Sequence, residues 1–118
     1  MAYIDGYVIP VPHGNKQAYI DMSAKAADVF IKHGALHVVE NWGDDLAKGK
    51  TTDFYRAVKA EEGETVVFSW ITWPSKEARN TGNAAAMTDP FFSDAGNTIF
   101  DGKRMIYSGF ETIFEKKA

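Results

Sequence analysis

Two carboxylates are the first candidates for chemistry, because each lies inside an apolar, strand-like run. Asp5 is in YIDGYVIPV and Glu40 is in LHVVENW. An unpaired charge in such a place is costly. One reading is a buried ion-pair network that fixes strand register or the dimer, with Arg56 and Arg104 as the available cations. The other is a carboxylate with a raised pKa that lines a pocket and takes a proton from a bound ligand.

Aromatic side chains in the same runs are the second candidate group, since they could form the walls of a ligand cavity. Aromatic residues at strand spacing form ordinary core more often than a binding site. Successive side chains of a strand alternate between its two faces, so Trp70 and Trp73 point to opposite sides. At most one of them can line a given cavity. The candidate ligand-binding residues are Asp5, Tyr7, Glu40, Trp42, Arg56, Trp70 and Arg104.

Several other chemistries find no support in the sequence. The chain has no cysteine, which excludes disulfides, a thiol nucleophile and a thiolate-bound metal. Carboxylates near His37, the one histidine expected to face a cavity, show no ligand spacing, so no metal site is predicted. Ser69 lies in no GxSxG motif and no glycine-rich phosphate loop is present. We therefore expect neither a metal nor a cofactor.

The elements that must position these residues follow from hydrophobic periodicity. The clearest helix has its apolar face at spacings of three and four from Tyr19 to Phe30, with Asn15 as its expected N-cap. Ser75 is expected to cap a second helix, whose small residue Gly82 permits close approach to a sheet. The predicted order is strand 3–11, helix 16–33, strand 36–42, strand 66–73, helix 75–88, loop 90–102 and strand 103–114.

The order βαββαβ predicts an α+β, ferredoxin-like fold for residues 1–118 as one domain, with an antiparallel sheet and two helices on one face. Strand residues 66–73 are apolar on both sides. Two helices cannot cover both faces of such a sheet, and an uncovered aromatic face is unusual for a monomer. We expect a homodimer with two sheets packed face to face as a barrel. The alternative is that segment 46–65, in which 53–60 reads as a short helix or irregular strand, folds over its own sheet.

Composition limits the partners and the location. The 118 residues are 45% hydrophobic and 25% charged, with a net charge of −3. Nothing in that balance attracts nucleic acid or an anionic membrane. No apolar run approaches a membrane span, and the N-terminus lacks a signal-peptide pattern. We therefore expect a cytoplasmic protein with no nucleic-acid or membrane partner.

A set of short segments carries a family resemblance, of which FDGKRMIY at residues 100–107 is the most specific. The others are residues 3–8, 33–36, 39–40, 53–54, 56–60, 66–71, 74–75 and 109–110. With these the chain resembles the YbaA-like family of uncharacterised bacterial proteins. The resemblance implies the dimeric α/β-barrel superfamily and no established activity. Ser108, where relatives tend to have glycine, and the loop 91–99 depart from the family pattern.

Three functions remain open from the sequence. The first is a homodimer that binds a small aromatic or apolar molecule in its barrel. The second, by fold analogy, is a cofactor-independent monooxygenase-like enzyme with Asp5 or Glu40 as base and Arg104 stabilising anionic charge. The third is a structural or regulatory interaction module with a filled barrel. An enclosed space of roughly 300 Å³ or more, reached by polar groups, favours a ligand.

Overall fold

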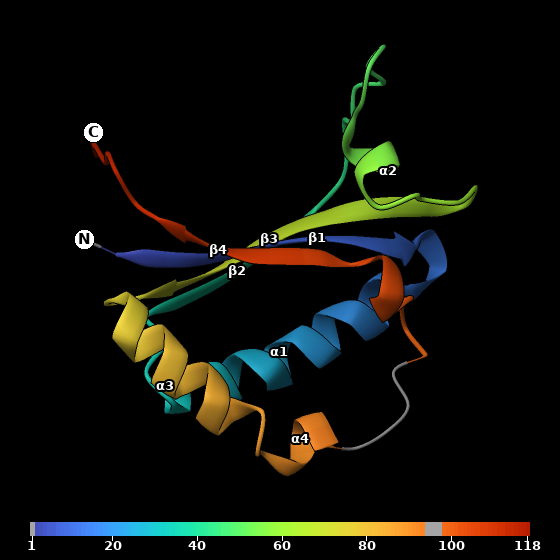
Figure 1. Ribbon diagram of the computed structural model, residues 1–118. Helices are drawn as coiled ribbons and strands as arrows, with labels where there is room; N and C mark the ends of the chain where they lie inside the picture. The colour runs from blue at the N-terminus through green and yellow to red at the C-terminus, as the bar shows by residue number, and fades with distance from the viewer. Residues whose placement is uncertain (1, 94–97) are drawn as a thin grey trace.

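The computed structural model describes residues 2–93 and 98–118. Four antiparallel strands form one sheet in the order β2-β3-β1-β4 (Figure 1). The strands are β1 (Tyr3–Pro12), β2 (His37–Trp42), β3 (Glu64–Trp73) and β4 (Ile106–Glu111). The helices are η1 (His13–Asn15), α1 (Lys16–Lys32), α2 (Phe54–Ala57), α3 (Lys76–Ala86), α4 (Pro90–Ser93) and η2 (Gly102–Arg104). This confirms the βαββαβ order and is consistent with a ferredoxin-like α+β fold.

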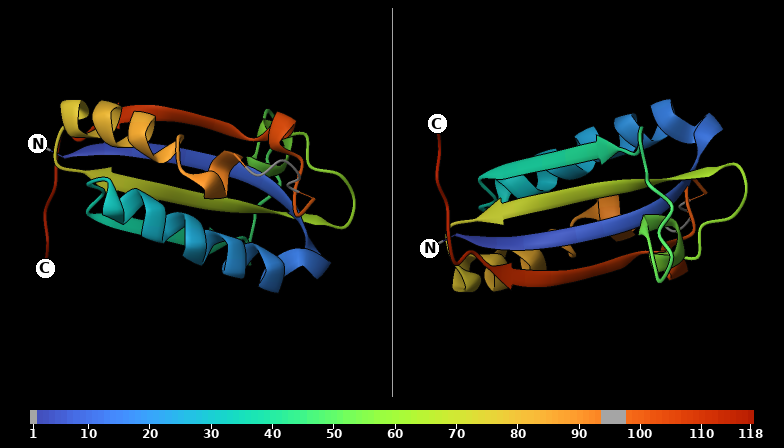
Figure 2. Two further views of the ribbon diagram at one scale, coloured as in Figure 1. Left: turned by 90° about the horizontal axis from the view of Figure 1, so that it is seen from below. Right: turned by 90° about the horizontal axis from the view of Figure 1, so that it is seen from above.

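The two faces of the sheet are covered differently. Helices α1, α3 and α4 lie on one side, which we call the helix face, and α2 lies on the other, the open face (Figures 1 and 2). Alternation along each strand assigns the side chains. Odd-numbered residues of β1, β3 and β4 and even-numbered residues of β2 belong to the helix face, and the others belong to the open face.

The core lies on the helix face in two clusters of buried side chains. One contains Phe30, Ala35, Ile71, Trp73 and Ala86, and the other contains Ile9, Val11, Tyr19 and Val67. Helix α3 sits close to the sheet because Gly82 has no side chain. A β-carbon there would overlap the Trp73 ring and lie 2.6 Å from the His33 carbonyl oxygen. The predicted close approach is confirmed at Gly82.

The segment between β2 and β3 covers one end of the open face. Helix α2 contacts β1 and β3, Val58 is buried, and the Phe54 ring lies 6.0 Å from that of Phe68. The remainder stays uncovered, with Phe68 47%, Ile106 48% and Phe110 57% exposed. The prediction that segment 46–65 folds over its own sheet is therefore met at one end only.

Of the two predicted helix caps, one is confirmed and the other is wrong. The Ser75 cap is confirmed, because its Oγ accepts from the Ala78 N–H at 3.1 Å. The Asn15 cap is wrong: its side-chain nitrogen donates instead to the Ile99 carbonyl at 2.7 Å. Residues 53–60 take the helical alternative, as α2.

The end of the chain differs most from its prediction. The last strand was predicted over 103–114, but η2 occupies its expected start and β4 ends at Glu111. The Asp101 carboxylate accepts from the Lys103 N–H at 3.0 Å, and this turn replaces the first strand residues. The predicted loop 90–102 begins with α4. Residues 94–97 of that loop, and so part of the divergent 91–99 stretch, lie outside the described residues.

Candidate functional site

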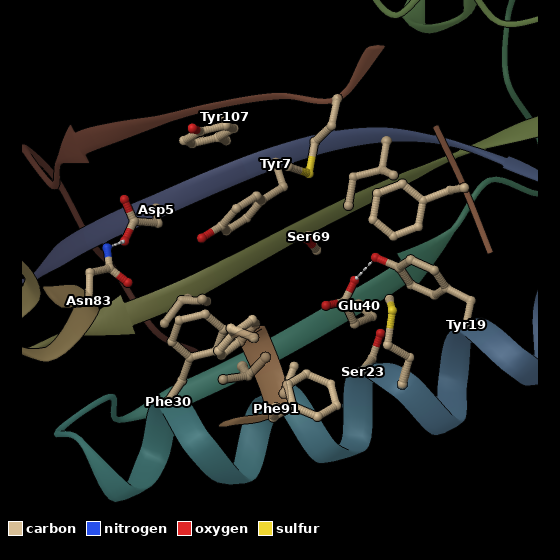
Figure 3. Close-up of a pocket in the computed structure, with 18 of the residues that line it drawn as sticks. Asp5, Tyr7, Tyr19, Ser23, Phe30, Glu40, Ser69, Asn83, Phe91 and Tyr107 are labelled. Atoms are coloured by element: carbon tan, nitrogen blue, oxygen red, sulfur yellow. Dashed lines mark hydrogen bonds between the residues drawn. The ribbon is translucent and has the colours of Figure 1, made fainter. Parts of the chain in front are cut away.

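A cavity of about 700 Å³ lies between the helix face and helices α1, α3 and α4 (Figure 3). Most of its wall is apolar. The apolar lining residues are Ile9, Met22, Ala26, Phe30, Val38, Ile71, Met87, Phe91, Phe92, Ile99, Phe100 and Met105. Polar groups enter from both the sheet and the helices: Asp5, Tyr7, Tyr19, Ser23, Glu40, Ser69, Arg79, Asn83 and Tyr107.

Strand register builds the floor of this cavity. Tyr7 pairs directly with Ser69 on β3 and with Tyr107 on β4, and Ser69 pairs with Glu40 on β2. Residues opposite each other in a sheet point to the same face. Tyr107, Tyr7, Ser69 and Glu40 therefore form one row across all four strands, beneath α1.

Glu40 is the carboxylate whose charge is not matched by a cation. Its Oε1 accepts a hydrogen bond from the Tyr19 hydroxyl at 2.7 Å. Burial raises its pKa above the ordinary glutamate value, while hydrogen bonding from Tyr19 and Ser69 lowers it less. The side chain stays accessible through the open cavity. Within residues 2–93 and 98–118, no Lys, Arg or His forms an ion pair with it.

Tyr7 brings a neutral hydroxyl to the same space. Its ring stacks on that of Tyr107 with centroids 5.9 Å apart. Burial raises the pKa of Tyr7, as it does that of Tyr19, so both phenols stay protonated. Figure 3 shows the Tyr7 hydroxyl directed into the cavity. Tyr7 can therefore donate or accept a hydrogen bond there, but it cannot act as a base near neutral pH.

Asp5, at the other end of the cavity, is fully partnered. It is only 3% exposed and forms an ion pair with Arg79 at 2.8 Å. The Trp73 indole N–H donates to it at 3.0 Å and the Asn83 amide at 3.1 Å. This network ties β1 to α3 across the core. Of the two readings of the strand carboxylates, the ion-pair reading describes Asp5 and the raised-pKa pocket reading fits Glu40.

The predicted cations for these carboxylates were wrong. Arg56 lies 3.7 Å from Asp53 and donates to the Lys50 carbonyl at 2.9 Å. Arg104 binds Glu64 through two hydrogen bonds of 2.7 and 2.8 Å. Both arginines come from connecting segments, and both are held by carboxylates or carbonyls of nearby segments. Neither reaches Asp5 or Glu40.

The structure thus brings together three of the seven candidate residues, Asp5, Tyr7 and Glu40. Trp42 is on the helix face but packs with the Ile9 cluster, with the Lys16 ammonium 5.6 Å above its ring. Trp70 is on the open face, 5.5 Å from the Phe68 ring. The opposite orientation of Trp70 and Trp73 is confirmed. Arg56 borders a separate pocket of about 460 Å³, and Arg104 lines neither space.

The histidines are not at the site. His37, the histidine expected to face a cavity, is exposed on the open face, because it is an odd-numbered residue of β2. His33 is four residues before it but closes α1, on the far side of the turn at Gly34. The described part of the chain contains no group of three or more His, Asp or Glu residues arranged for a metal ion. Nor does it contain a helix long and apolar enough to cross a membrane.

Four further site residues were missed as functional candidates. Periodicity places Tyr19 on the apolar face of its helix, and a buried tyrosine hydroxyl there requires a hydrogen-bond partner, which is Glu40. Arg79 and Asn83 are four apart on α3, and that spacing places both on one helix face. Phe91 follows Asp89-Pro90 and was assigned to a loop, whereas it lines the cavity from α4.

Comparison with known proteins finds relatives of unknown function. A family model described as "Protein of unknown function (DUF1428)" matches residues 2–102. The uncharacterised protein YbaA of Escherichia coli is 54% identical to the chain over 117 residues, which is 98% of this chain and 100% of the relative. The YbaA protein of Shigella flexneri matches with the same identity and coverage.

Proposed function

The chain belongs to this YbaA-like family of unknown function, and from the geometry of its cavity we propose that it binds a small aromatic or apolar molecule between its sheet and its helices. The observation that carries the proposal is the cavity itself. Its volume of about 700 Å³ falls within the range of small-molecule sites, and a few polar groups converge on mostly apolar walls. A filled interaction module would leave no such space.

The proposed ligand lies inside one chain. The sequence predicts a ligand in the interior of a dimeric barrel, on the side where two sheets would meet. The cavity supports a different position, on the opposite side of the sheet and beneath α1 and α3 (Figure 3). Ligand binding and dimer formation would then use different faces and could be tested separately.

A homodimer through the open face is the second part of the proposal. Between Ile4 and Val8, and on the strand segments beside them, this face presents no Lys, Arg, Asp or Glu. Its large residues are Ile4, Val8, Val39, Phe68, Trp70, Ile106 and Phe110. An uncharged apolar face can meet an identical copy without like-charge repulsion, as a two-fold interface requires.

The C-terminal tail supports the same partner. Ile113 and Phe114 are 86% and 78% exposed. Figure 1 shows the tail leaving β4 on the side of the sheet that also carries α2. The apolar surface of the open face therefore continues onto the tail, and a second copy could bury both together.

A cofactor-independent oxygenase is the second candidate function. One observation favours it: a carboxylate with a raised pKa stands beside neutral phenols in an apolar cavity, as a general base requires. Glu40 is its base, since Asp5 is held by Arg79. The predicted anion-stabilising role of Arg104 has no place in this cavity, because Arg104 does not line it. We therefore keep ligand binding as the conclusion.

A matched pair of substitutions on α1 tests ligand binding. Ala26 lines the cavity, whereas Ala24 is exposed on the same helix. The probe is 2-(1-naphthyl)ethanol, followed by NMR titration of the backbone amides. We expect shifts at residues around the cavity in the native chain and in Ala24→Phe. In Ala26→Phe, which fills the space, we expect the affinity to fall at least about tenfold. Shifts confined to the open face would refute the proposal.

A further inference from the structure

We infer that the ligand of this cavity is an amine, whose ammonium group pairs with Glu40 while its apolar or aromatic body fills the space between the sheet and the helices. The inference rests on the proposed function and adds the charge of the ligand. It follows from the distribution of charged and aromatic groups around the cavity.

The charges that line the cavity do not cancel. Its ionisable acids and bases other than tyrosine are Asp5, Glu40 and Arg79. Asp5 and Arg79 neutralise each other at 2.8 Å. Glu40 has hydroxyl donors as its partners, and no lining cation matches its charge when it is ionised. A bound cation would supply the missing charge, and an anionic ligand would be repelled.

The remaining walls suit an ammonium group as well. Seven of the lining side chains are aromatic: Tyr7, Tyr19, Phe30, Phe91, Phe92, Phe100 and Tyr107. The faces of aromatic rings attract cations, and the attraction increases where water is excluded. Ser69 is the neighbour of Glu40 in the floor row and Tyr7 follows Ser69, and the hydroxyl oxygens of both can accept N–H bonds from an ammonium group.

Glu40 can accept further hydrogen bonds at its carboxylate. The Tyr19 hydroxyl donates to Oε1, and the side chain projects from β2 into the space between the floor and α1 (Figure 3). A carboxylate can accept several hydrogen bonds at its two oxygens. A charge-assisted bond to an ammonium is roughly twice as strong as a neutral one. Desolvation of Glu40, which raises its pKa, would be offset when the cation binds.

Three probes with one body and different charges test the inference by isothermal titration calorimetry near neutral pH. They are 2-(1-naphthyl)ethylamine, which is cationic, 2-(1-naphthyl)ethanol, which is neutral, and 1-naphthylacetate, which is anionic. We expect the amine to bind at least about tenfold more tightly than the alcohol, and the carboxylate most weakly. In Glu40→Gln the advantage of the amine over the alcohol should disappear.

Two control variants separate the local charge from other effects. Asp28→Asn removes one negative charge from the exposed side of α1 and should preserve the order of the three probes. Tyr19→Phe removes the hydroxyl donor but keeps Glu40, so the preference for the amine should survive. Equal affinity for amine and alcohol, or a preference that persists in Glu40→Gln, would overturn the inference while leaving ligand binding intact. Failure of all three probes would overturn the proposed function as well.

Discussion

Both faces of the sheet carry apolar side chains. Helices cover those of the helix face and enclose a cavity with them, whereas most of those on the open face are uncovered. On the helix face, apolar residues surround a cavity that also receives the carboxylates of Asp5 and Glu40. On the open face, the strand positions from Ile4 to Val8 and those beside them include His37 but no Lys, Arg, Asp or Glu, and α2 covers only one end. A face with polar groups around a cavity suits a small ligand. A mostly apolar face without such a cavity suits another protein surface.

The first prediction concerns Asp5 on the helix face, where we expect the largest effect on the free energy of unfolding. Asp5→Ala leaves Arg79, the Trp73 indole and the Asn83 amide without their acceptor. Breaking a buried pair costs about 3–5 kcal/mol, and the lower end applies because Arg79 is 22% exposed. We expect a loss of about 3 kcal/mol in the free energy of unfolding, measured by urea denaturation.

The control for that measurement is an exposed ion pair. Glu61 lies 3.8 Å from Arg104, and its side chain is 75% exposed. Glu61→Gln should change the free energy of unfolding by less than about 0.5 kcal/mol. If Asp5→Ala were as mild as this control, the Asp5 network would not hold β1 to α3, and Asp5 would become available for a role in the cavity.

The second prediction concerns the open face. Phe110 is 57% exposed on β4, so a polar residue there is tolerated by the single chain. Phe110→Glu would place a charge on each copy at the proposed dimer interface. We expect the dimer dissociation constant to rise at least about tenfold, measured by native mass spectrometry over a dilution series. Ala24→Glu, on the exposed side of α1, is the matched control and should leave the dimer unchanged.

A native chain that is monomeric at every concentration would refute the dimer. It would also show that segment 46–65 and the tail protect the open face sufficiently. The cavity on the helix face would be unaffected by that result, since its lining residues all come from one chain. This independence is what separates the two faces experimentally.

More of the fold than of the candidate site could be predicted from the sequence. Periodicity and the helix-capping residue Ser75 predicted the element order, because these signals are local. The charge partners depended on contacts between distant segments. Asp5 and Arg79 are 74 residues apart, and their contact requires α3 to dock at Gly82 on the Trp73 ring. The sequence offers Arg56 and Arg104 as available cations, whereas the docking of α3 brings Arg79 to Asp5.

The floor row shows the same limit in the strands. Alternation along a strand shows which residues share a face with Tyr7 or with Glu40 on their own strands. It does not show that the two residues lie in the same row across the sheet. Their alignment through Ser69 depends on the register of two strand pairs. A one-residue shift would have placed Glu40 on the open face.

The smallest predicted effect is the pH-dependent contribution of Glu40 to the stability of the fold. Its pKa is raised in the folded chain, so the folded state holds the proton to higher pH than the unfolded state does. The contribution of this group to stability is therefore greatest below the unfolded pKa. It falls as the pH rises through the folded pKa, and is constant above it.

Glu40→Gln removes that dependence and keeps an acceptor for the Tyr19 hydroxyl. Because the carboxylate remains accessible through the cavity, we expect the variant to gain no more than about 0.5 kcal/mol at neutral pH. The gain should shrink to nothing in acid, as measured from thermal unfolding of both proteins at a series of pH values. Taking the difference between the two profiles cancels Glu64 and Asp101, whose pKa values are lowered by Arg104 and whose contributions have the opposite sign. A loss of stability at neutral pH would instead mean that the ionised carboxylate is an indispensable acceptor for Tyr19. Glu40 would then have a structural role like that of Asp5, and neither carboxylate of the cavity would be available for a ligand.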